Sequence, residues 1–356
     1  MTIQPQKNSS ITDIRNLDRS GLVEFFESHG MRSFRADQTL RWLYSRRAKS
    51  FAEMTDLAKE ARSLLAENFS IGKPEIRDMQ TGEDGTCKFL LGLEDGNAVE
   101  SVLIKEKDHY TLCISTQVGC AMGCAFCMTG KTGLTRNLSR AEIIGQVIAA
   151  MDEAETRGDM RLSNIVLMGM GEPLANYRNV ISAIGAITDS NWGLKFSTRK
   201  VTLSTAGLAD KLGDLAKDTR IRLAVSLNAA DNPTRNRLMP VNRIFPIERL
   251  IEACSRYPLA LRDKITFEYI LIKGVNDSEK HAVKLAELLR PVRAKINLIP
   301  FNPYPGSEFV RPDTDVIEAF QSVLAEKNYT AIIRWSKGTD ISAACGQLRG
   351  VPNHKS

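Results

Sequence analysis

The sequence Cys120-Ala121-Met122-Gly123-Cys124-Ala125-Phe126-Cys127 places three cysteines at the spacing C-x3-C-x2-C in a glycine-containing loop. The loop follows an apolar, strand-like run at residues 111–118. Three thiolates at such a spacing can bind three irons of a [4Fe-4S] cluster and leave the fourth iron without a protein ligand. The spacing therefore predicts an iron–sulfur cluster with one iron open to a substrate.

Two other interpretations of these cysteines start from the same residues. A structural zinc site closes its shell with four Cys or His ligands, and only His109 and Cys113 stand near in sequence, neither at finger spacing. The cysteines could also be small buried side chains, but chance seldom sets three thiols at this spacing in one loop.

The composition bounds the class of protein. The 356 residues suffice for one large α/β barrel with an appendage or for two medium domains. An apolar content of 43% and a charged content of 25% are ordinary for a soluble globular protein, and no run of eighteen apolar residues predicts a membrane span. The polar residues 1–16 lack the apolar segment of a signal peptide, and seven cysteines fit a reducing compartment, so we expect a cytoplasmic location.

The charge is moderately basic, and its distribution is uneven. The net charge is +6, and the cations of one short stretch have a single acid, Asp37, among them: Arg32, Arg35, Arg41, Arg46, Arg47 and Lys49. Such a cluster is what binding to phosphates requires, although a solvated helix face is the alternative. Helical spacing at residues 11–28, 36–50 and 51–68 predicts that residues 1–75 form an all-α, RNA-binding accessory domain.

From about residue 76 the apolar period changes to two. Strand-like runs at 87–93 and 98–105 are bracketed by Asp84-Gly85 and Asp95-Gly96, which favour tight hairpin turns. Residues 76–108 are therefore predicted to be a linking β-ribbon.

After the cysteine loop, apolar strands and amphipathic helices alternate over residues 109–350. Strands are predicted at 111–118, 164–170, 200–204, 222–227, 265–271, 295–300 and 330–334, with helices at 139–155, 177–188, 208–215, 247–255, 278–289 and 315–326. Ser139 with Glu142 is a capping box, and Asn276 or Asp277 can cap the helix that follows. Repeated β-α units predict a parallel sheet with right-handed crossovers, here a partial (β/α)6 barrel.

Polar and small residues follow several of these strands. Gly171 and Glu172 follow the second strand, and Ser204, Ser226-Leu227-Asn228 and Asn302 stand at or just after the ends of the third, fourth and sixth. Ligands of parallel α/β sheets bind at the carboxyl ends of the strands. Singly these are ordinary turn residues, but together they predict a binding rim.

The cysteine spacing, with Phe126 before the last cysteine, resembles the radical S-adenosylmethionine (SAM) superfamily. Five further motifs resemble the RlmN type of RNA adenine-C2 methyltransferase: residues 113–120 (CISTQVGC), 169–174 (GMGEPL), 201–205 (VTLST), 296–303 (INLIPFNP) and 340–348 (DISAACGQL). The resemblance runs from about residue 34 to 350. It implies the radical SAM barrel, a [4Fe-4S] cluster held by Cys120, Cys124 and Cys127, and two SAM molecules per turnover.

The resemblance also implies the remaining site residues. SAM would contact Gly171, Glu172, Ser204, Ser226, Leu227, Asn228 and Asn302, and Asn228 departs from the His that we associate with that place in several members. C2 of adenine has no lone pair with which to attack SAM. In the family's mechanism, Cys345 first takes a methyl group from one SAM, and a radical derived from a second SAM activates this methyl group for addition to C2. Glu100 accepts the C2 proton. Cys113 then releases the product by forming a disulfide with Cys345.

The implied substrates are one adenosine of 23S ribosomal RNA in the peptidyl-transferase centre and the adenosine beside the anticodon of transfer RNA. An electron donor such as flavodoxin or ferredoxin, no membrane and a monomeric state are expected. Three alternatives stay open on the sequence: a C8 methyltransferase of the same ribosomal adenosine that confers antibiotic resistance, an RNA-binding protein with a structural iron–sulfur cluster, and a radical SAM enzyme that does not act on RNA.

Overall fold

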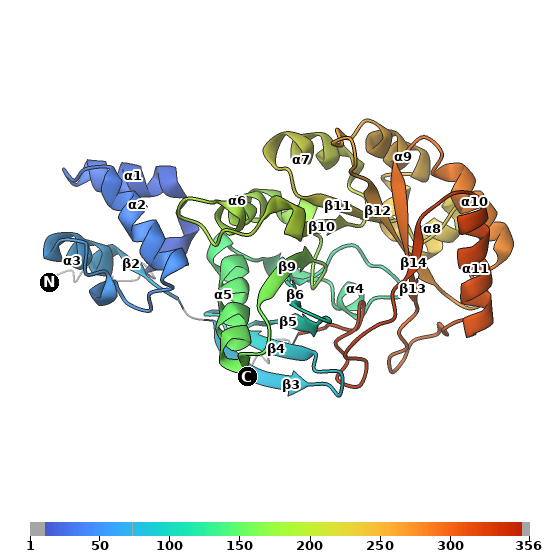
Figure 1. Cartoon of the computed structure of the whole chain (residues 1–356), viewed down its shortest axis with the longest axis horizontal. Coiled ribbons are helices and arrows are strands. Elements are labelled where there is room, and N and C mark those ends of the chain that lie inside the picture. The colour runs from blue at the N-terminus through green and yellow to red at the C-terminus, as the bar shows by residue number, and fades with distance from the viewer. Residues whose placement is uncertain (1–10, 73, 351–356) are drawn as a thin grey trace, which may run out of the picture.

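A mixed sheet forms the frame of the molecule (Figure 1). The computed structural model describes residues 11–72 and 74–350, and within them the sheet has ten strands. Its parallel part consists of β6 (Tyr110–Cys113), β9 (Leu162–Leu167), β10 (Val201–Thr205), β11 (Arg222–Ser226), β12 (Ile265–Leu271), β13 (Ala294–Pro300) and β14 (Ala331–Ile333), paired in that order. The partial barrel predicted from the alternation of strands and helices is confirmed.

Three antiparallel strands extend the same sheet beyond β6. They are β3 (Glu75–Thr81), β4 (Cys87–Gly92) and β5 (Ala98–Lys105), and β5 pairs directly with β6. The predicted linking ribbon is therefore continuous with the barrel sheet, and β3 is a strand that the sequence pattern missed. In Figure 1 these strands lie at the edge of the sheet farthest from β14.

Helices cover the convex face of the parallel strands. They are α5 (Arg140–Arg157), α6 (Tyr177–Thr188), α7 (Leu212–Asp218), α9 (Ile247–Ser255), α10 (Glu279–Leu288) and α11 (Thr314–Glu326). Alternate strand residues point at these helices, and Ile165, Leu203 and Phe267 are fully buried there. Each such side chain contributes about 1.5–3 kcal/mol by leaving water.

The two predicted helix caps have different outcomes. Ser139 and Glu142 form the capping box at the start of α5, as predicted. The cap predicted for α10 is wrong, because α10 follows Ser278 and has no side-chain cap hydrogen bond. Asn276 instead turns back to the strand ends, where its Nδ2 donates to the carbonyl of Asn228 (2.8 Å).

The amino-terminal module is shorter in its helices than predicted and contains a strand pair. Its helices are α1 (Arg19–Ser28), α2 (Phe34–Leu40), which continues into the π-helical turn Arg41–Ser45, and α3 (Lys59–Asn68). The two-residue strands β1 (Thr12–Asp13) and β2 (Phe69–Ser70) pair in parallel. The expectation of an all-α module is corrected by this pair, which is too short to show an alternating pattern in the sequence.

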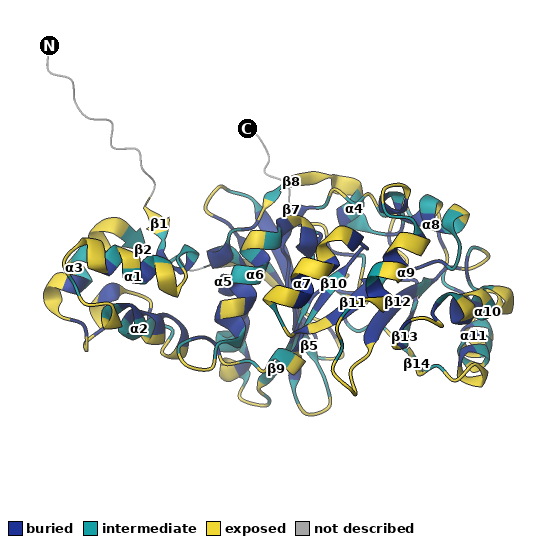
Figure 2. Ribbon diagram, turned by 90° about the horizontal axis from the view of Figure 1, so that it is seen from above, coloured by how far each residue is buried: buried dark blue, intermediate teal, exposed yellow. Residues whose placement is uncertain are grey.

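Figure 2 shows the amino-terminal module beside α5 of the barrel. Two arginines join the module to the barrel there. The buried guanidinium of Arg140 donates to the carbonyl of Leu17 and to the hydroxyl of Tyr44, both at 2.9 Å. Arg47 forms ion pairs with Asp152 and Glu155 of α5. Arg47 thus connects the amino-terminal module to the barrel, although its position in the sequence had suggested that it binds phosphate.

The strand predicted at 111–118 is interrupted after Cys113. Backbone pairing resumes in β7 (Gln117–Gly119), which forms a separate hairpin with β8 (Leu134–Asn137). Between the hairpin strands lie the cysteine loop and α4 (Met128–Thr132), and a further short helix, α8 (Asn232–Leu238), follows β11. In the described part of the chain, no helix is long and apolar enough to span a membrane.

Candidate active site

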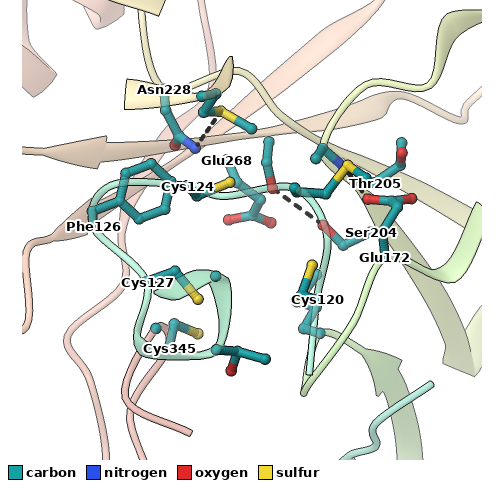
Figure 3. A pocket seen from close by; sticks show the side chains of 18 of the residues that line it. Cys120, Cys124, Phe126, Cys127, Glu172, Ser204, Thr205, Asn228, Glu268 and Cys345 are labelled. Carbon is teal, nitrogen blue, oxygen red and sulfur yellow. Dashed lines mark hydrogen bonds between the residues drawn. The ribbon is translucent and has the colours of Figure 1, made fainter. Parts of the chain in front are cut away.

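A pocket with a cavity volume of about 160 Å³, partly open to solvent, lies at the carboxyl ends of the parallel strands (Figure 3). Nine of the residues singled out from the sequence line it: Cys120, Cys124, Cys127, Gly171, Glu172, Ser204, Ser226, Asn228 and Cys345. The remaining four, Glu100, Cys113, Leu227 and Asn302, are not among the residues that line it. The structure therefore gathers most of the predicted rim and four of the five predicted cysteines in one pocket.

The three loop cysteines point into the pocket from different sides (Figure 3). The loop is held by backbone bonds, from Cys120 N–H to the carbonyl of Gly133 (2.8 Å) and from Cys127 N–H to that of Cys124 (3.1 Å). Gly130 packs so closely that an added Cβ would lie 2.9 Å from the Cys124 nitrogen. Only glycine allows this approach of α4 to the loop.

The donors of the loop are three thiols, which are the usual ligands of iron–sulfur clusters. In residues 11–72 and 74–350 no three Cys, His, Asp or Glu side chains form a group that could hold one metal ion. The three thiols instead face a shared space, as a cluster larger than one ion requires. Burial raises the pKa of Cys120 to about 11 and raises that of Cys124 further, so binding of irons would release thiol protons.

Glu172 is a buried carboxylate at the pocket wall. Its Oε2 accepts a hydrogen bond from Ala206 N–H (2.6 Å) and its Oε1 from Leu174 N–H (3.0 Å). Burial raises the pKa of Glu172 to about 7, and the backbone donors oppose that rise. The neighbouring Gly171 has φ +100° and no room for a Cβ, which would lie 2.6 Å from the Gln117 side chain. A cationic ligand group would restore the ionised carboxylate.

Arg235 joins the ends of β10 and β11 by hydrogen bonds to the backbone that follows each strand. Ser204 and Ser226 lie side by side, with their Oγ atoms 3.5 Å apart. The fully buried guanidinium of Arg235 donates to the carbonyls of Ala206 (2.7 Å) and Leu227 (3.0 Å). Burial lowers the pKa of Arg235 to about 10. Leu227 is fully buried and does not line the pocket, so its part in a ligand site would be through the backbone.

Asn228 has a structural reason to be an asparagine. Its φ is +58°, in the left-handed region that asparagine tolerates better than most residues. Its side-chain oxygen accepts from Ile270 N–H (2.9 Å) and its Nδ2 donates to the Met239 sulfur (3.2 Å). The amide thus links β11, β12 and the segment after α8, and its polar atoms are already bonded to protein.

Cys345 reaches the pocket on the segment that follows β14. The Nδ2 of Asn302 donates to the carbonyl of Cys345 (3.3 Å), and Met128 N–H donates to that of Gly346 (2.8 Å). Asn302 therefore positions this segment. The Cys345 side chain has exposed surface because it faces the pocket, yet protein surrounds it otherwise, and burial, followed by the charges of Glu268 and Cys127, raises its pKa to about 11.

Cys113 lies behind Cys345, at the end of β6. It is 7% exposed, and burial, followed by the nearby Cys345, raises its pKa well above the ordinary thiol value. The two thiols are thus close enough for their charges to interact, although the residues stand far apart in the sequence. Both cysteines are free.

Glu100 lies on β5, outside the pocket, under the end of the Cys345 segment. Its Oε1 forms an ion pair with Lys88 Nζ (3.3 Å). Its Oε2 accepts from the backbone N–H groups of Arg349 (2.7 Å) and Gly350 (3.1 Å). The carboxylate therefore anchors the segment that delivers Cys345.

The sequence reasoning missed Glu268, a second buried carboxylate in the pocket. It lies on β12, is 6% exposed, and accepts a hydrogen bond from Asn297 Nδ2 (2.9 Å). Burial raises the pKa of Glu268 to about 7. The available signal was a charged residue in the middle of the apolar run Ile265–Leu271.

Comparison with known proteins agrees with this geometry. Residues 12–71 match the Ribosomal RNA large subunit methyltransferase N-terminal domain, and residues 114–286 match the Radical SAM superfamily. A crystal structure of a radical SAM methyltransferase from Sphaerobacter thermophilus has a TM-score of 0.89 and 41% identity, covering 95% of this chain and 99% of that one. The fold is that of a radical SAM methyltransferase.

Curated relatives make the assignment narrower. The dual-specificity RNA methyltransferase RlmN of Desulfosudis oleivorans is 56% identical over 94% of this chain and 90% of its own, and that of Syntrophus aciditrophicus is 50% identical over 95% and 96%. The chain belongs to the RlmN family of RNA methyltransferases. The radical SAM family implies a [4Fe-4S] cluster and SAM, which the three thiols and the rim fit.

Proposed function

We propose that this protein methylates C2 of one adenosine in the peptidyl-transferase centre of 23S ribosomal RNA and of the adenosine beside the anticodon of transfer RNA. The observation that carries the proposal is the position of Cys345. A chain segment that begins after the last strand brings this thiol into the same pocket as Cys120, Cys124 and Cys127, with Cys113 behind it.

We propose that different residues of the pocket bind the cluster and SAM. Cys120, Cys124 and Cys127 would hold a [4Fe-4S] cluster, which together with SAM supplies the methyl group and the one-electron chemistry when bound. Gly171, Glu172, Ser204, Ser226, Leu227, Asn228 and Asn302 are proposed to form the SAM site. Within it the buried Glu172 suits a ligand ammonium, because an opposite charge offsets the cost of its burial.

Cys345 is proposed to carry the methyl group to the base and Cys113 to end the reaction. Once the Cys345 methylene carbon is bonded to C2, the Cys113 sulfur attacks the Cys345 sulfur. A disulfide forms, the carbon–sulfur bond breaks, and its electron pair stays with the methylated base, which takes up a proton. Two SAM molecules are used per product in this scheme.

Glu100 is proposed to accept the C2 proton. In this structure its Oε2 is bonded to the amides of Arg349 and Gly350. The role therefore requires the Cys345 segment to shift when RNA enters, which loops that carry catalytic residues commonly do.

The proposed organisation has three parts. In this proposal residues 1–75 bind RNA, residues 76–108 link this domain to the barrel, and residues 109–350 form the catalytic barrel. Arg46 stacks on Trp42 with its guanidinium 4.0 Å from the ring centre, and Arg35 on Phe34 at 4.8 Å, which supports an RNA-facing surface on the first part. Flavodoxin or ferredoxin as electron donor, a monomeric state and a cytoplasmic location complete the proposal.

The test is an anaerobic assay with reconstituted protein, SAM, reductant and RNA that lacks the modification. Digested nucleosides are then analysed by mass spectrometry. We expect 2-methyladenosine from the wild-type protein and none from Cys345→Ala. The appearance of 8-methyladenosine would assign the chain to C8 chemistry, and the absence of any methylated adenosine would contradict the proposal.

A further inference from the structure

Four cations gather on the concave side of the sheet. Arg222 begins β11, Lys264 immediately precedes β12, Lys295 is the second residue of β13, and Arg334 directly follows β14. We call these four residues the cationic mouth.

Strand alternation places the mouth on the same face of the sheet as the pocket. Ser226 and Ile299 line the pocket. Arg222 and Lys295 stand four residues before them on the same strands, so their side chains leave the same face. Thr266 pairs with both Lys295 and Ala224, which sets the starts of these strands at one level. Arg222, Lys264 and Lys295 therefore lie toward the end of the concave surface opposite the cysteine loop. Arg334 follows Ile333, the partner of Leu298, and so extends the mouth to the level of the pocket-lining Ile299.

The charges of the mouth repel one another. In the described ranges, 11–72 and 74–350, none of the four side chains forms an ion pair or a side-chain hydrogen bond. Lys295 is half-buried, and its pKa is lowered by burial first and then by Arg222 and Arg334, while the charge of Glu268 opposes this shift. Arg136, by contrast, pairs with the carboxylates of Asp95 and Glu142. Like charges held together without an ion-pair partner favour an anionic ligand.

A polar path leads from the mouth to Cys345. Asn297 lies two residues after Lys295 on β13, and its Nδ2 donates to Glu268 on the neighbouring strand. Glu268 lines the pocket and is close enough to Cys345 to raise the pKa of that thiol. Both Lys295 and Arg334 in turn act on the charge of Glu268. Asn297 and Glu268 thus connect the level of Lys295 with the pocket that Cys345 lines.

We propose that the cationic mouth binds the phosphates that flank the target nucleotide, so that the base enters from the amino ends of the strands and meets Cys345 from below. This inference rests on the proposed function and adds a binding site to it. The ligand class is single-stranded or looped RNA, because a base that is modified inside a protein must leave its stack. Trp335, next to Arg334 and 52% exposed, offers a ring on which a neighbouring base can stack.

The test measures binding of an RNA hairpin, with the target adenosine in its loop, at several salt concentrations. The variant is the double substitution Arg222→Gln and Lys295→Gln in the full-length, reconstituted protein. The matched control is Lys280→Gln with Lys327→Gln, which removes two exposed cations from the outer helical layer. SAM binding and iron content of both proteins serve as controls for folding.

We expect the mouth variant to bind RNA roughly tenfold more weakly at low salt. The slope of log affinity against log salt should fall by about 0.7 for each phosphate of single-stranded RNA that the variant no longer neutralises. The control should keep the wild-type slope.

A mouth variant with the affinity and slope of the control would overturn the inference. So would unchanged RNA binding with slower reduction by flavodoxin, because the mouth would then be a docking surface for an acidic protein. Methylation by the wild-type protein is measured in a separate assay of its nucleoside product, so that the binding site and the proposed function are tested independently. If it lacks methyladenosine while the slope still falls in the mouth variant, the proposed function fails and the phosphate site stands.

Discussion

The Oε2 atom of Glu100 lies 2.7 Å from the backbone nitrogen of Arg349 and accepts its hydrogen bond. The bond closes a loop between β5 and the segment that carries Cys345, 249 residues apart in sequence. A hydrogen bond to a charged group is worth about 1.5–3 kcal/mol, so this carboxylate holds the segment in place before RNA binds. The proposed proton acceptor and the proposed methyl carrier are therefore mechanically connected.

The substitution Glu100→Gln tests the role of Glu100 as proton acceptor separately from its role in holding the Cys345 segment. Glutamine keeps a side-chain oxygen that accepts from Arg349 N–H but cannot take up the C2 proton. We expect product formation to fall by about 10²–10⁴-fold, the usual contribution of a general base. Mass spectrometry of the protein should still find Cys345 methylated, because that step needs no C2 proton removal. Lys88→Met, which removes only the ion pair partner, is the control, and equal product from both variants would contradict the role.

Arg235→Met should destabilise the barrel strongly. The substitution leaves the buried carbonyls of Ala206 and Leu227 without donors. Each unsatisfied buried acceptor costs about 1–3 kcal/mol, so the free energy of unfolding should fall by at least about 2 kcal/mol. Urea denaturation measures it. Arg237→Met on the same helix, where the side chain is exposed, should cost less than about 1 kcal/mol, and similar losses in both would refute the structural role of Arg235.

Glu268→Gln should change how stability depends on pH. Burial raises the pKa of Glu268 from 4.5 to about 7, so between these values the folded protein holds a proton that the unfolded chain releases. Stability therefore decreases as pH rises through this window, by about 3 kcal/mol for this group, and levels off above it.

Urea unfolding of the cluster-free protein near pH 5 and pH 7.5 measures the difference. Glutamine stays neutral, so the variant should lose less stability than the wild type across the window. The stability of the variant should still decrease somewhat with pH, because burial also raises the pKa of Glu172. Glu318→Gln, at an exposed position of α11, is the control. A wild-type slope in the Glu268 variant would show that this carboxyl titrates normally.

The sequence allowed the local part of the site to be predicted. Cys120, Cys124 and Cys127 lie in one loop, so their spacing alone indicated shared chemistry. The rim residues Ser204 and Ser226 could be assigned because parallel strands end at the same edge. Cys345 was reached only through its resemblance to a family motif, since a lone cysteine in a loop carries little information by itself.

What escaped prediction depends on register and on distant contacts. Whether Glu268 faces the pocket or the helices is set by the pairing of β12 with its neighbours, which period-two patterning in a buried strand does not determine. Arg235 resembles a solvent-exposed helix cation in the sequence, but the turn after β11 encloses it. Arg47 was grouped with RNA-binding cations because its partners, Asp152 and Glu155, lie far away in the sequence.

The most direct measurement concerns the pair Cys113 and Cys345. Cys113→Ala protein is incubated anaerobically with SAM, reductant and unmodified RNA, denatured, and examined by gel and mass spectrometry for RNA attached to protein. We predict a covalent adduct that joins Cys345 to the target adenosine through one carbon, because the thiol that would cleave it is missing. The adduct should be absent when Cys345→Ala is added to the same variant. Free methylated RNA from Cys113→Ala, formed without an adduct and at the wild-type rate, would contradict the assigned roles of both cysteines.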